Sequence, residues 1–177
     1  MLKLRLFLIL SITISFLSLS KTITAATPTL NLTFPKKIKK APSFELKLLD
    51  GTSIFLEDLK GKIVLLNFWS IYCTPCREEM VSLQTLWQHY KNMGLIVIAV
   101  SVDRNDKVQT EEYIKNSELT FPIGLDINKK LRQLYEIKAL PTSYIIRRNG
   151  EFLARIIGER NWANKEILVY FKNLLSK

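Results

Sequence analysis

The sequence predicts one α/β domain built on a mixed β-sheet, and three observations carry that prediction. Residues 63–69 and 95–100 are almost continuous apolar runs, which suit central strands buried on both faces. Between them, residues 75–92 repeat apolar side chains at three- and four-residue steps, the period of a helix with one buried face. Residues 44–56 and 143–156 each read as a hairpin, with a turn dipeptide between two strand-like runs. Strands that alternate with helices, with a hairpin near each end, give an α/β domain with a mixed sheet.

The elements before the second central strand have recognisable ends. The first hairpin turns at Asp50-Gly51, a dipeptide typical of tight β-turns. The long helix is followed by Gly94, and glycine is common just past a helix end. The whole chain has 177 residues, 47% of them apolar and 24% charged, so one such domain with a core of normal size is expected.

The second half of the domain continues the alternation. We expect a helix over residues 108–116, a short strand over 121–125 and a short helix over 128–135. The last hairpin turns at Asn149-Gly150. We expect Asn161 to cap the final helix. The buried face of that helix is formed by Ile167, Phe171, Leu174 and Leu175.

Residues 1–26 are interpreted as a secretory signal peptide. Lys3 and Arg5 give a positive start, residues 4–19 are mostly apolar, and Thr24-Ala25-Ala26 offers a small-residue cleavage site. The apolar run is shorter than the ~20 residues of a membrane-spanning helix, although an uncleaved anchor is the alternative. Both interpretations send the rest of the chain across the membrane.

Residues 27–40 are predicted to be a basic tether, and the domain itself to comprise residues 41–177. The tether contains two prolines and a run of four lysines with few large apolar residues, so it reads as a solvated linker or as a contact to anionic lipid headgroups. The formal net charge of +10 falls to +7 without the three basic residues of 1–26. Basic and aromatic residues are not interleaved elsewhere, so a nucleic-acid partner is not expected.

The chain has two cysteines, Cys73 and Cys76, and their spacing indicates a redox-active pair rather than a disulfide that stabilises the fold. A disulfide between them closes almost no loop, so it adds little to stability. A zinc site would need two further ligands, and His89 is the one additional soft ligand in the sequence. We therefore expect no metal and no cofactor, and interpret His89 as an exposed polar residue.

The positions of the two cysteines predict a different role for each. Cys73 ends the loop after a buried strand, and Pro75 begins the following helix, where proline is well tolerated. Free N–H groups and the positive end of the helix dipole then lower the thiol pKa of Cys73. Cys76 lies one turn further in, where it can attack a mixed disulfide formed at Cys73. We expect Cys73 to attack, Cys76 to resolve, and the two to form a redox-active disulfide.

The segment 68–80, Phe-Trp-Ser-Ile-Tyr-Cys-Thr-Pro-Cys-Arg-Glu-Glu-Met, resembles the active-site segment of thioredoxins. It is most similar to that of the exported TlpA/ResA-type thiol–disulfide oxidoreductases, relatives of the AhpC/TSA redoxins. The similarity extends from about Ala41 to the C-terminus. It implies a thioredoxin fold, in which helices flank a central mixed sheet, with an N-terminal β-hairpin extension and an inserted helical segment between Asp103 and Phe121.

The resemblance also implies a location, in the periplasm or at the outer face of the cytoplasmic membrane of a bacterium, and an activity. In this branch the usual role is reductive: disulfides of exported proteins such as apocytochrome c are reduced during cytochrome c maturation, with electrons from a membrane thiol protein. The chain is expected to be a monomer. The same motif also serves disulfide-forming oxidants or isomerases, so the direction stays open at this stage. A thiol peroxidase would carry Pro-x-x-x-Thr/Ser-x-x-Cys, and Ser70 fits this pattern whereas Leu66 does not.

Two positions bear on proton transfer in the resembled family. Cytoplasmic thioredoxins bury an Asp where this chain has Asn67, which cannot titrate. ResA-type members carry a Glu three residues after the second cysteine, and Glu79 occupies that position. Glu79 is interpreted either as a partly buried carboxylate that exchanges protons with Cys76, or as an ordinary acid in the first helical turn.

The remaining expected site residues shape the surface. Residues 139–143 match the family's cis-proline loop, so the resemblance implies a cis bond between Leu140 and Pro141, against the cysteine pair. Trp69 is expected to pack beside the site, and Tyr72 to form an aromatic rim. Trp162 is interpreted as a core residue.

Overall fold

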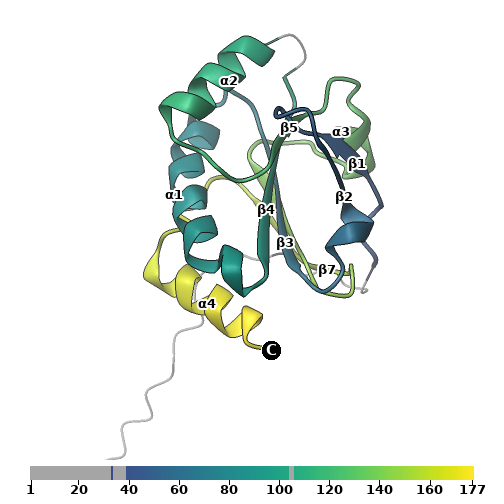
Figure 1. Cartoon of the computed structure of the whole chain (residues 1–177), viewed down its shortest axis with the longest axis vertical. Coiled ribbons are helices and arrows are strands. Elements are labelled where there is room, and N and C mark those ends of the chain that lie inside the picture. The colour runs from purple at the N-terminus through teal and green to yellow at the C-terminus, as the bar shows by residue number, and fades with distance from the viewer. Residues whose placement is uncertain (1–32, 34–38, 104–105) are drawn as a thin grey trace, which may run out of the picture.

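The computed structural model describes residues 33, 39–103 and 106–177, which form a five-stranded sheet with flanking helices (Figure 1). The signal peptide or anchor expected for residues 1–26 lies outside the described residues. The elements in chain order are β1 (Glu45–Lys47), β2 (Ser53–Phe55), η1 (Leu56–Leu59), β3 (Ile63–Trp69), α1 (Thr74–Tyr90), η2 (Lys91–Met93), β4 (Leu95–Ser101), α2 (Lys107–Asn116), β5 (Ile123–Leu125), α3 (Lys130–Leu134), β6 (Thr142–Ile146), β7 (Phe152–Ile157) and α4 (Lys165–Leu175).

The sheet is mixed, as predicted, with strand order β5-β4-β3-β6-β7. β3, β4 and β5 are parallel, whereas β6 is antiparallel to β3 and β7 is antiparallel to β6. Trp69 at the end of β3 lies opposite Ser101 at the end of β4. The loops that leave these two strands therefore start at the same edge of the sheet.

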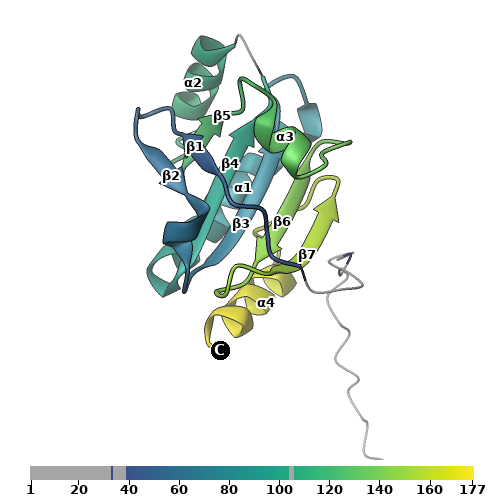
Figure 2. The same ribbon diagram turned by 90° about the vertical axis from the view of Figure 1, so that its right-hand side faces the viewer.

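Helices α1, α2 and α4 cover one face of the sheet, and α3 with the β1–β2 hairpin covers the other (Figures 1 and 2). All seven residues of β3 are buried, which explains why its sequence is an almost continuous apolar run. Leu65 and Trp69 belong to the core on the α1 face. Leu66 and Phe68 belong to the core on the hairpin face. Asn67 shares the parity of Leu65 and Trp69, so its side chain faces α1.

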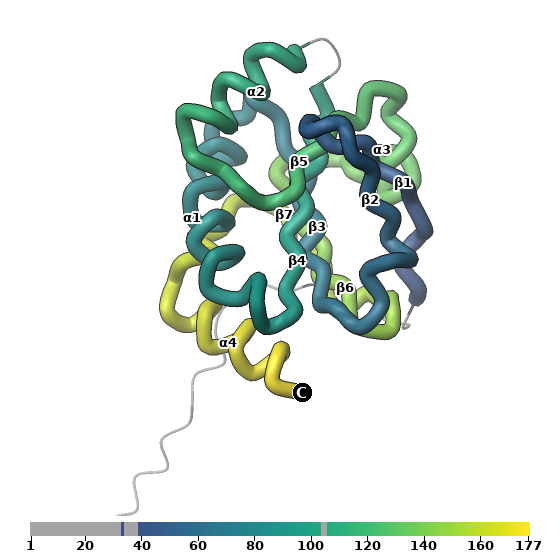
Figure 3. The backbone as a smooth tube through the Cα atoms, in the orientation of Figure 1, coloured from purple at the N-terminus to yellow at the C-terminus, as the bar shows by residue number. Residues whose placement is uncertain are grey.

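The hairpin extension is tied to the sheet at β5. Leu48 forms a β-bridge with Gly124. A Cβ atom added at Gly124 would lie 2.6 Å from the Lys47 carbonyl oxygen and from a Leu46 side-chain carbon, so only glycine allows this approach. The path of the chain through the hairpin and into β3 can be followed in Figure 3.

The described part of the predicted tether runs beside the edge strand β7. The Thr33 N–H donates to the Arg155 carbonyl at 3.0 Å, and the Phe152 N–H donates to the Lys39 carbonyl at 2.9 Å. Lys40 also forms a β-bridge, with Glu151. These contacts shield part of an edge that would otherwise present unpaired backbone groups.

The structure corrects the prediction that Asn161 caps the last helix. The cap is Asn164, whose side-chain oxygen accepts the Glu166 N–H at 2.8 Å. Asn161 instead accepts the Ala163 N–H at 3.1 Å, in a turn that buries Trp162 completely before the helix begins. Both asparagines have cap chemistry, but the turn that begins at Asn161 and contains the buried Trp162 comes before the helix, so Asn164 is the residue at its N-terminus.

The other differences from the predicted elements are small. The long helix begins at Thr74, so Pro75 is its second residue rather than its first. It ends in a 3₁₀ turn before Gly94, whose φ of 95° is the left-handed conformation expected of a helix-ending glycine. Leu174 is half-buried. Among residues 33, 39–103 and 106–177, no helix has the length and apolar character needed to cross a bilayer.

Candidate active site

The cysteine pair lies where β3 passes into α1. Cys73 is the N-cap residue of α1 and is half-buried, whereas Cys76 in the first turn has no exposed surface. The two form a disulfide, with Cα atoms 5.2 Å apart. The Cys76 N–H points at the Cys73 sulfur, 3.3 Å away. A thiolate at Cys73 would therefore meet a free N–H and the positive end of the α1 dipole, as the sequence predicts.

Glu79 is buried on the same helix, one turn after Cys76. Its side chain is 3% exposed. One carboxyl oxygen, Oε1, accepts the Asn67 amide at 2.6 Å. The other, Oε2, accepts the Arg160 backbone N–H at 3.0 Å and the Trp162 indole N–H at 3.2 Å. This geometry agrees with the interpretation of Glu79 as a buried carboxyl beside the pair rather than as a solvated helix-start acid.

The surroundings of Glu79 bring its titration into the neutral range. Burial disfavours the charged carboxylate and raises the pKa of Glu79 to about 7. The hydrogen bonds from Arg160, Asn67 and Trp162, and the positive charge of Arg160, act in the opposite direction without cancelling the effect of burial. A group with a pKa near neutral pH can both release and accept a proton under physiological conditions.

Asn67 is suited to both protonation states of this carboxyl. Its amide nitrogen donates to Glu79 and also to the Ser143 hydroxyl oxygen, at 2.9 Å. An amide turned by 180° would present its oxygen to a protonated Glu79, and the Ser143 hydroxyl could then donate instead of accept. Because the Asn67 side chain cannot titrate, it can form a hydrogen bond with either protonation state of Glu79 without taking up the proton itself.

Glu79 also borders solvent-accessible space. A hollow of about 490 Å³ is lined by residues of α1 and of the loop before α4, among them Glu79, Ser82 and Arg160. The buried carboxyl therefore belongs to a residue that borders this hollow.

The aromatic and proline residues expected around the site lie as follows. Trp69 is fully buried, and its ring centroid is 5.6 Å from that of Tyr113 on α2. Tyr72, next to Cys73, is 69% exposed, and its role as an aromatic rim stays a prediction. Pro75 is exposed in the first turn of α1. His89 is exposed near the far end of that helix.

The peptide bond between Leu140 and Pro141 is cis, as the resemblance implies. Phe68 is paired with Thr142, so Pro141 is level with Trp69 on the neighbouring strand. This register puts the proline at the sheet edge from which the cysteine loop leaves. Leu140 is half-buried and contacts the cores on both faces of the sheet.

Sequence reasoning missed several partners of the site. Trp162 is a core residue, as the sequence predicts, but no local signal connects it or Arg160 to Glu79. Asn67 did leave a signal, because it is the one polar residue in the apolar run of β3. The hydroxyl of Ser70 donates to Asp103 at 2.6 Å rather than to a cysteine, and Leu66 is core, so the peroxidase alternative gains no support here.

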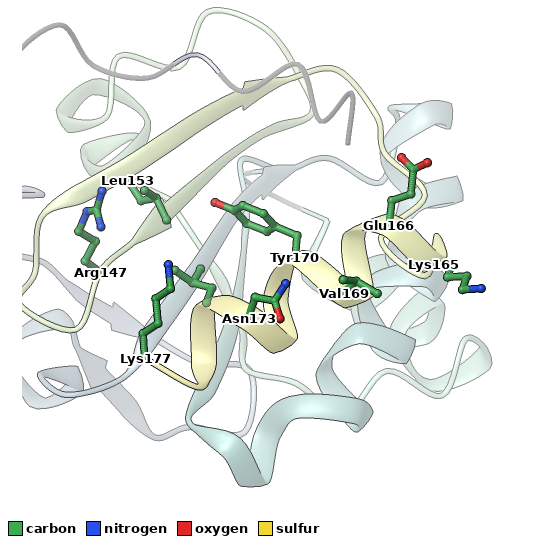
Figure 4. A pocket seen from close by; sticks show the side chains of 9 residues that line it. Arg147, Leu153, Lys165, Glu166, Val169, Tyr170, Asn173 and Lys177 are labelled. Carbon is green, nitrogen blue, oxygen red and sulfur yellow. The ribbon is translucent and has the colours of Figure 1, made fainter. Parts of the chain in front are cut away.

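Other hollows lie away from the cysteines. One of about 600 Å³ lies between α4 and the β6–β7 hairpin, with Leu153, Tyr170 and Asn173 in its lining (Figure 4). None of its lining residues belongs to the segment 67–80. Within the part of the chain that the structure describes, no group of three or more His, Cys, Asp or Glu side chains is arranged as metal ligands would be.

Comparisons with known proteins agree with this geometry. A family model described as the AhpC/TSA family matches residues 38–154. The thiol-disulfide oxidoreductase ResA of Bacillus anthracis is 38% identical over 122 residues, which cover 69% of this chain and 70% of that protein. ResA of Bacillus subtilis (strain 168) is 34% identical over 118 residues, covering 67% and 65% of the two chains. The crystal structure of StoA from Bacillus subtilis has a TM-score of 0.63 at 27% identity, covering 77% of this chain and 98% of StoA.

The matched range contains the cysteine pair and the elements around it, although Arg160 and Trp162 lie beyond its end. It includes the hairpin extension, both cysteines, Glu79 and the cis-proline. The chain therefore belongs to the AhpC/TSA family and, within it, to the ResA-like thiol–disulfide oxidoreductases of thioredoxin fold.

Proposed function

We propose that this exported oxidoreductase works as a protein-disulfide reductase, with Cys73 as the attacking thiol, Cys76 as the resolving thiol and Glu79 as the proton-exchanging group. The single observation that carries the proposal is the buried carboxyl of Glu79, one helical turn from the buried Cys76. A disulfide pair that served only stability would not need such a group beside it.

The exchange proceeds in two steps that move two electrons to the substrate. The Cys73 thiolate attacks one sulfur of a substrate disulfide, forms a mixed disulfide and releases the first substrate thiolate. The Cys76 thiolate then attacks the Cys73 sulfur, which breaks the mixed disulfide and releases the second substrate thiolate. The protein is left with the Cys73–Cys76 disulfide, the state in the structure.

Glu79 supports the second step. Cys76 is fully buried, so its thiol cannot deliver a proton directly to water. Ionised Glu79 takes the proton from the Cys76 thiol as that thiol becomes a nucleophile. Protonated Glu79 then releases the proton to solvent through the hollow lined by Ser82 and Arg160. A pKa of about 7 for Glu79 allows both transfers at neutral pH.

The same carboxyl favours the reducing direction. A strong disulfide oxidant stabilises its reduced form, chiefly as a low-pKa thiolate. An ionised Glu79 opposes thiolate formation at the neighbouring cysteine through like-charge repulsion. The reduced pair is then a better electron donor and a poorer acceptor.

The substrates and location follow from the same proposal. The substrates are exported proteins with disulfides, such as apocytochrome c during cytochrome c maturation, and a membrane thiol protein returns the electrons. The protein acts as a monomer at the outer face of the cytoplasmic membrane or in the periplasm. Residues 1–26 direct export, and residues 27–40 link the domain 41–177 to the membrane surface.

The test is the redox state of the pair in intact cells, trapped by rapid thiol alkylation. A reductase keeps Cys73 and Cys76 mostly as thiols, whereas a mostly disulfide-bonded population would make the protein an oxidant. Insulin reduction by the purified protein, with Cys73→Ser as the control, checks the exchange itself. Turnover equal to that of Cys73→Ser would refute the catalytic role of the pair.

A further inference from the structure

Asp103 is a buried carboxylate that the chemistry above does not use. It follows β4 and is 8% exposed. Its Oδ1 accepts the Ser70 hydroxyl at 2.6 Å, and its Oδ2 accepts the Ile71 N–H at 2.8 Å and the Ser101 hydroxyl at 2.9 Å. Hydrogen bonds to a charged, buried acceptor are among the stronger ones in proteins. The carboxylate therefore joins the loop after β3 to the loop after β4.

Ser70 and Asp103 together accept the backbone N–H groups of three consecutive loop residues, Ile71, Tyr72 and Cys73. The Ile71 N–H goes to Asp103, the Tyr72 N–H to the Ser70 hydroxyl oxygen at 3.1 Å, and the Cys73 N–H to the Ser70 carbonyl at 3.1 Å. The Cys73 sulfur is then left facing the Cys76 N–H. The direction of that sulfur thus depends on how this short loop is held.

The segment after Asp103 makes further contacts to the same region. The Asp106 carboxylate, at the start of α2, lies near the Tyr72 hydroxyl and raises the pKa of that tyrosine. On α2, the Tyr113 hydroxyl donates to the Arg77 carbonyl at 2.8 Å, and its ring packs on Trp69. The inserted helical segment therefore lies against the loop, its exposed tip and the first turn of α1. Figure 1 shows α2 beside α1.

We propose that Ser70 and Asp103 are positioning residues for Cys73: they anchor its loop to the base of the inserted segment and so hold its sulfur at the N-terminus of α1. The Asp103 charge by itself would oppose a thiolate, so the role is one of geometry rather than of electrostatic activation. This inference rests on the proposed function of Cys73 as the attacking thiol.

Ser70→Ala is the informative variant, because it removes the hydroxyl link and leaves the Asp103 charge unchanged. Two quantities are measured: amide hydrogen exchange at Tyr72 in the oxidised protein, and the rate of Cys73 alkylation against pH in the reduced protein. We expect protection of the Tyr72 N–H to fall about tenfold, the loss of roughly one hydrogen bond. The alkylation midpoint of Cys73 should move to higher pH, with several-fold slower reaction below it. Ser70→Thr, which keeps the hydroxyl, should restore both.

The matched control is Asp126→Asn. Asp126 is another buried carboxylate after a strand, 4% exposed, but it binds the Leu131 and Arg132 N–H groups of α3 at 3.0 and 2.7 Å. The Asp126→Asn variant should have lower thermal stability, with no change in the hydrogen exchange of Tyr72 or in the alkylation of Cys73.

Unchanged exchange and alkylation in Ser70→Ala, or equal changes in Asp126→Asn, would overturn the inference. If Ser70→Ala did not fold, Asp103→Asn is the second variant, because its amide has one acceptor oxygen and cannot accept from both the Ser70 hydroxyl and the Ile71 N–H. We expect lower hydrogen-exchange protection of Ile71 or Tyr72 in this variant, and unchanged protection of both would overturn the inference. Hydrogen exchange and alkylation are both measured without turnover. A wild-type protein that failed to reduce insulin would therefore contradict the proposed function, whereas the positioning role of Ser70 and Asp103 could still be tested.

Discussion

The two faces of the sheet both bury polar side chains, but they do so differently. On the α1 face, the Glu79 carboxyl has three hydrogen-bond donors around it and a pKa raised to about 7. On the hairpin face, the hydroxyls of Tyr135 and Tyr144 each donate to one backbone carbonyl, of Pro42 and Tyr135 respectively, both at 2.7 Å. Burial raises the pKa of both tyrosines further above neutral, so they stay uncharged.

The difference separates polar groups that fix a structure from polar groups that move a proton. A neutral hydroxyl with one matched acceptor satisfies a buried polar group at modest cost. A buried acid with a pKa near 7 is held at the boundary between two charge states, which is typical of groups that work in catalysis. The comparison predicts that a change at Glu79 on the α1 face alters the exchange activity, whereas a change at a tyrosine of the hairpin face alters stability alone.

The largest effects are expected at the cysteines. Cys73→Ser and Cys76→Ser should each lose turnover to the background rate, because each removes one of the two thiols that the exchange needs. Cys76→Ser should accumulate mixed disulfides with substrate, seen on non-reducing gels, whereas Cys73→Ser should form none. Faster alkylation of Cys76 than of Cys73 in the reduced protein would reverse the two roles.

Glu79→Gln should lower exchange activity by about 10²-fold, at the lower end of what a proton-transfer group contributes. The apparent thiol pKa values should fall by about one unit, because a negative charge beside Cys76 is removed. Alkylation rate against pH and reductase activity are the two measurements. Glu78→Gln is the matched control, since Glu78 is an exposed acid one position earlier on the same helix. Equal behaviour of the two variants would return Glu79 to the role of a helix-start acid.

Glu79 should also make the oxidised protein less stable as the pH rises. Below pH ~4.5 the folded and unfolded chains both hold the Glu79 proton, so the group makes no difference. Between pH ~4.5 and ~7 the folded protein keeps a proton that the unfolded chain has released, so the free energy of unfolding falls with rising pH.

The expected total is about 3 kcal/mol over that window, at roughly 1.4 kcal/mol per pKa unit. Denaturant unfolding of wild type and Glu79→Gln is measured at several pH values. The contribution of Glu79 is the difference between the two proteins in how the free energy of unfolding changes with pH. Parallel pH profiles for the two proteins would contradict it.

The smallest effect is expected on the opposite face. Tyr135→Phe removes the hydroxyl that binds the Pro42 carbonyl and should lower the free energy of unfolding by about 1 kcal/mol. Turnover per folded molecule should stay at the wild-type value. If Tyr135→Phe lost as much activity as Glu79→Gln, the claim that the two faces of the sheet bury polar groups for different purposes would be wrong.

The fold could be predicted largely from the sequence because its strongest signals are local. The apolar run of residues 63–69 coincides with β3, and Gly94 ends the helix region as expected. Cys73, Cys76 and Glu79 share one short segment, so helical spacing alone relates them. The partners of Glu79 could not be found this way, because Arg160 and Trp162 come from positions 81 and 83 residues away. The same holds for the link between Ser70 and Asp103, which depends on two parallel strands that end at one edge.

The most direct test of Glu79 as the proton-exchanging group is a titration of its carboxyl carbon by ¹³C NMR in the oxidised protein. The resonance is assigned by its absence from Glu79→Gln. We expect a titration midpoint of about 7, since burial outweighs the hydrogen bonds that stabilise the carboxylate. A midpoint near the ordinary 4.5 would show a carboxyl that stays ionised at neutral pH, and the proton-transfer role of Glu79 would have to be abandoned.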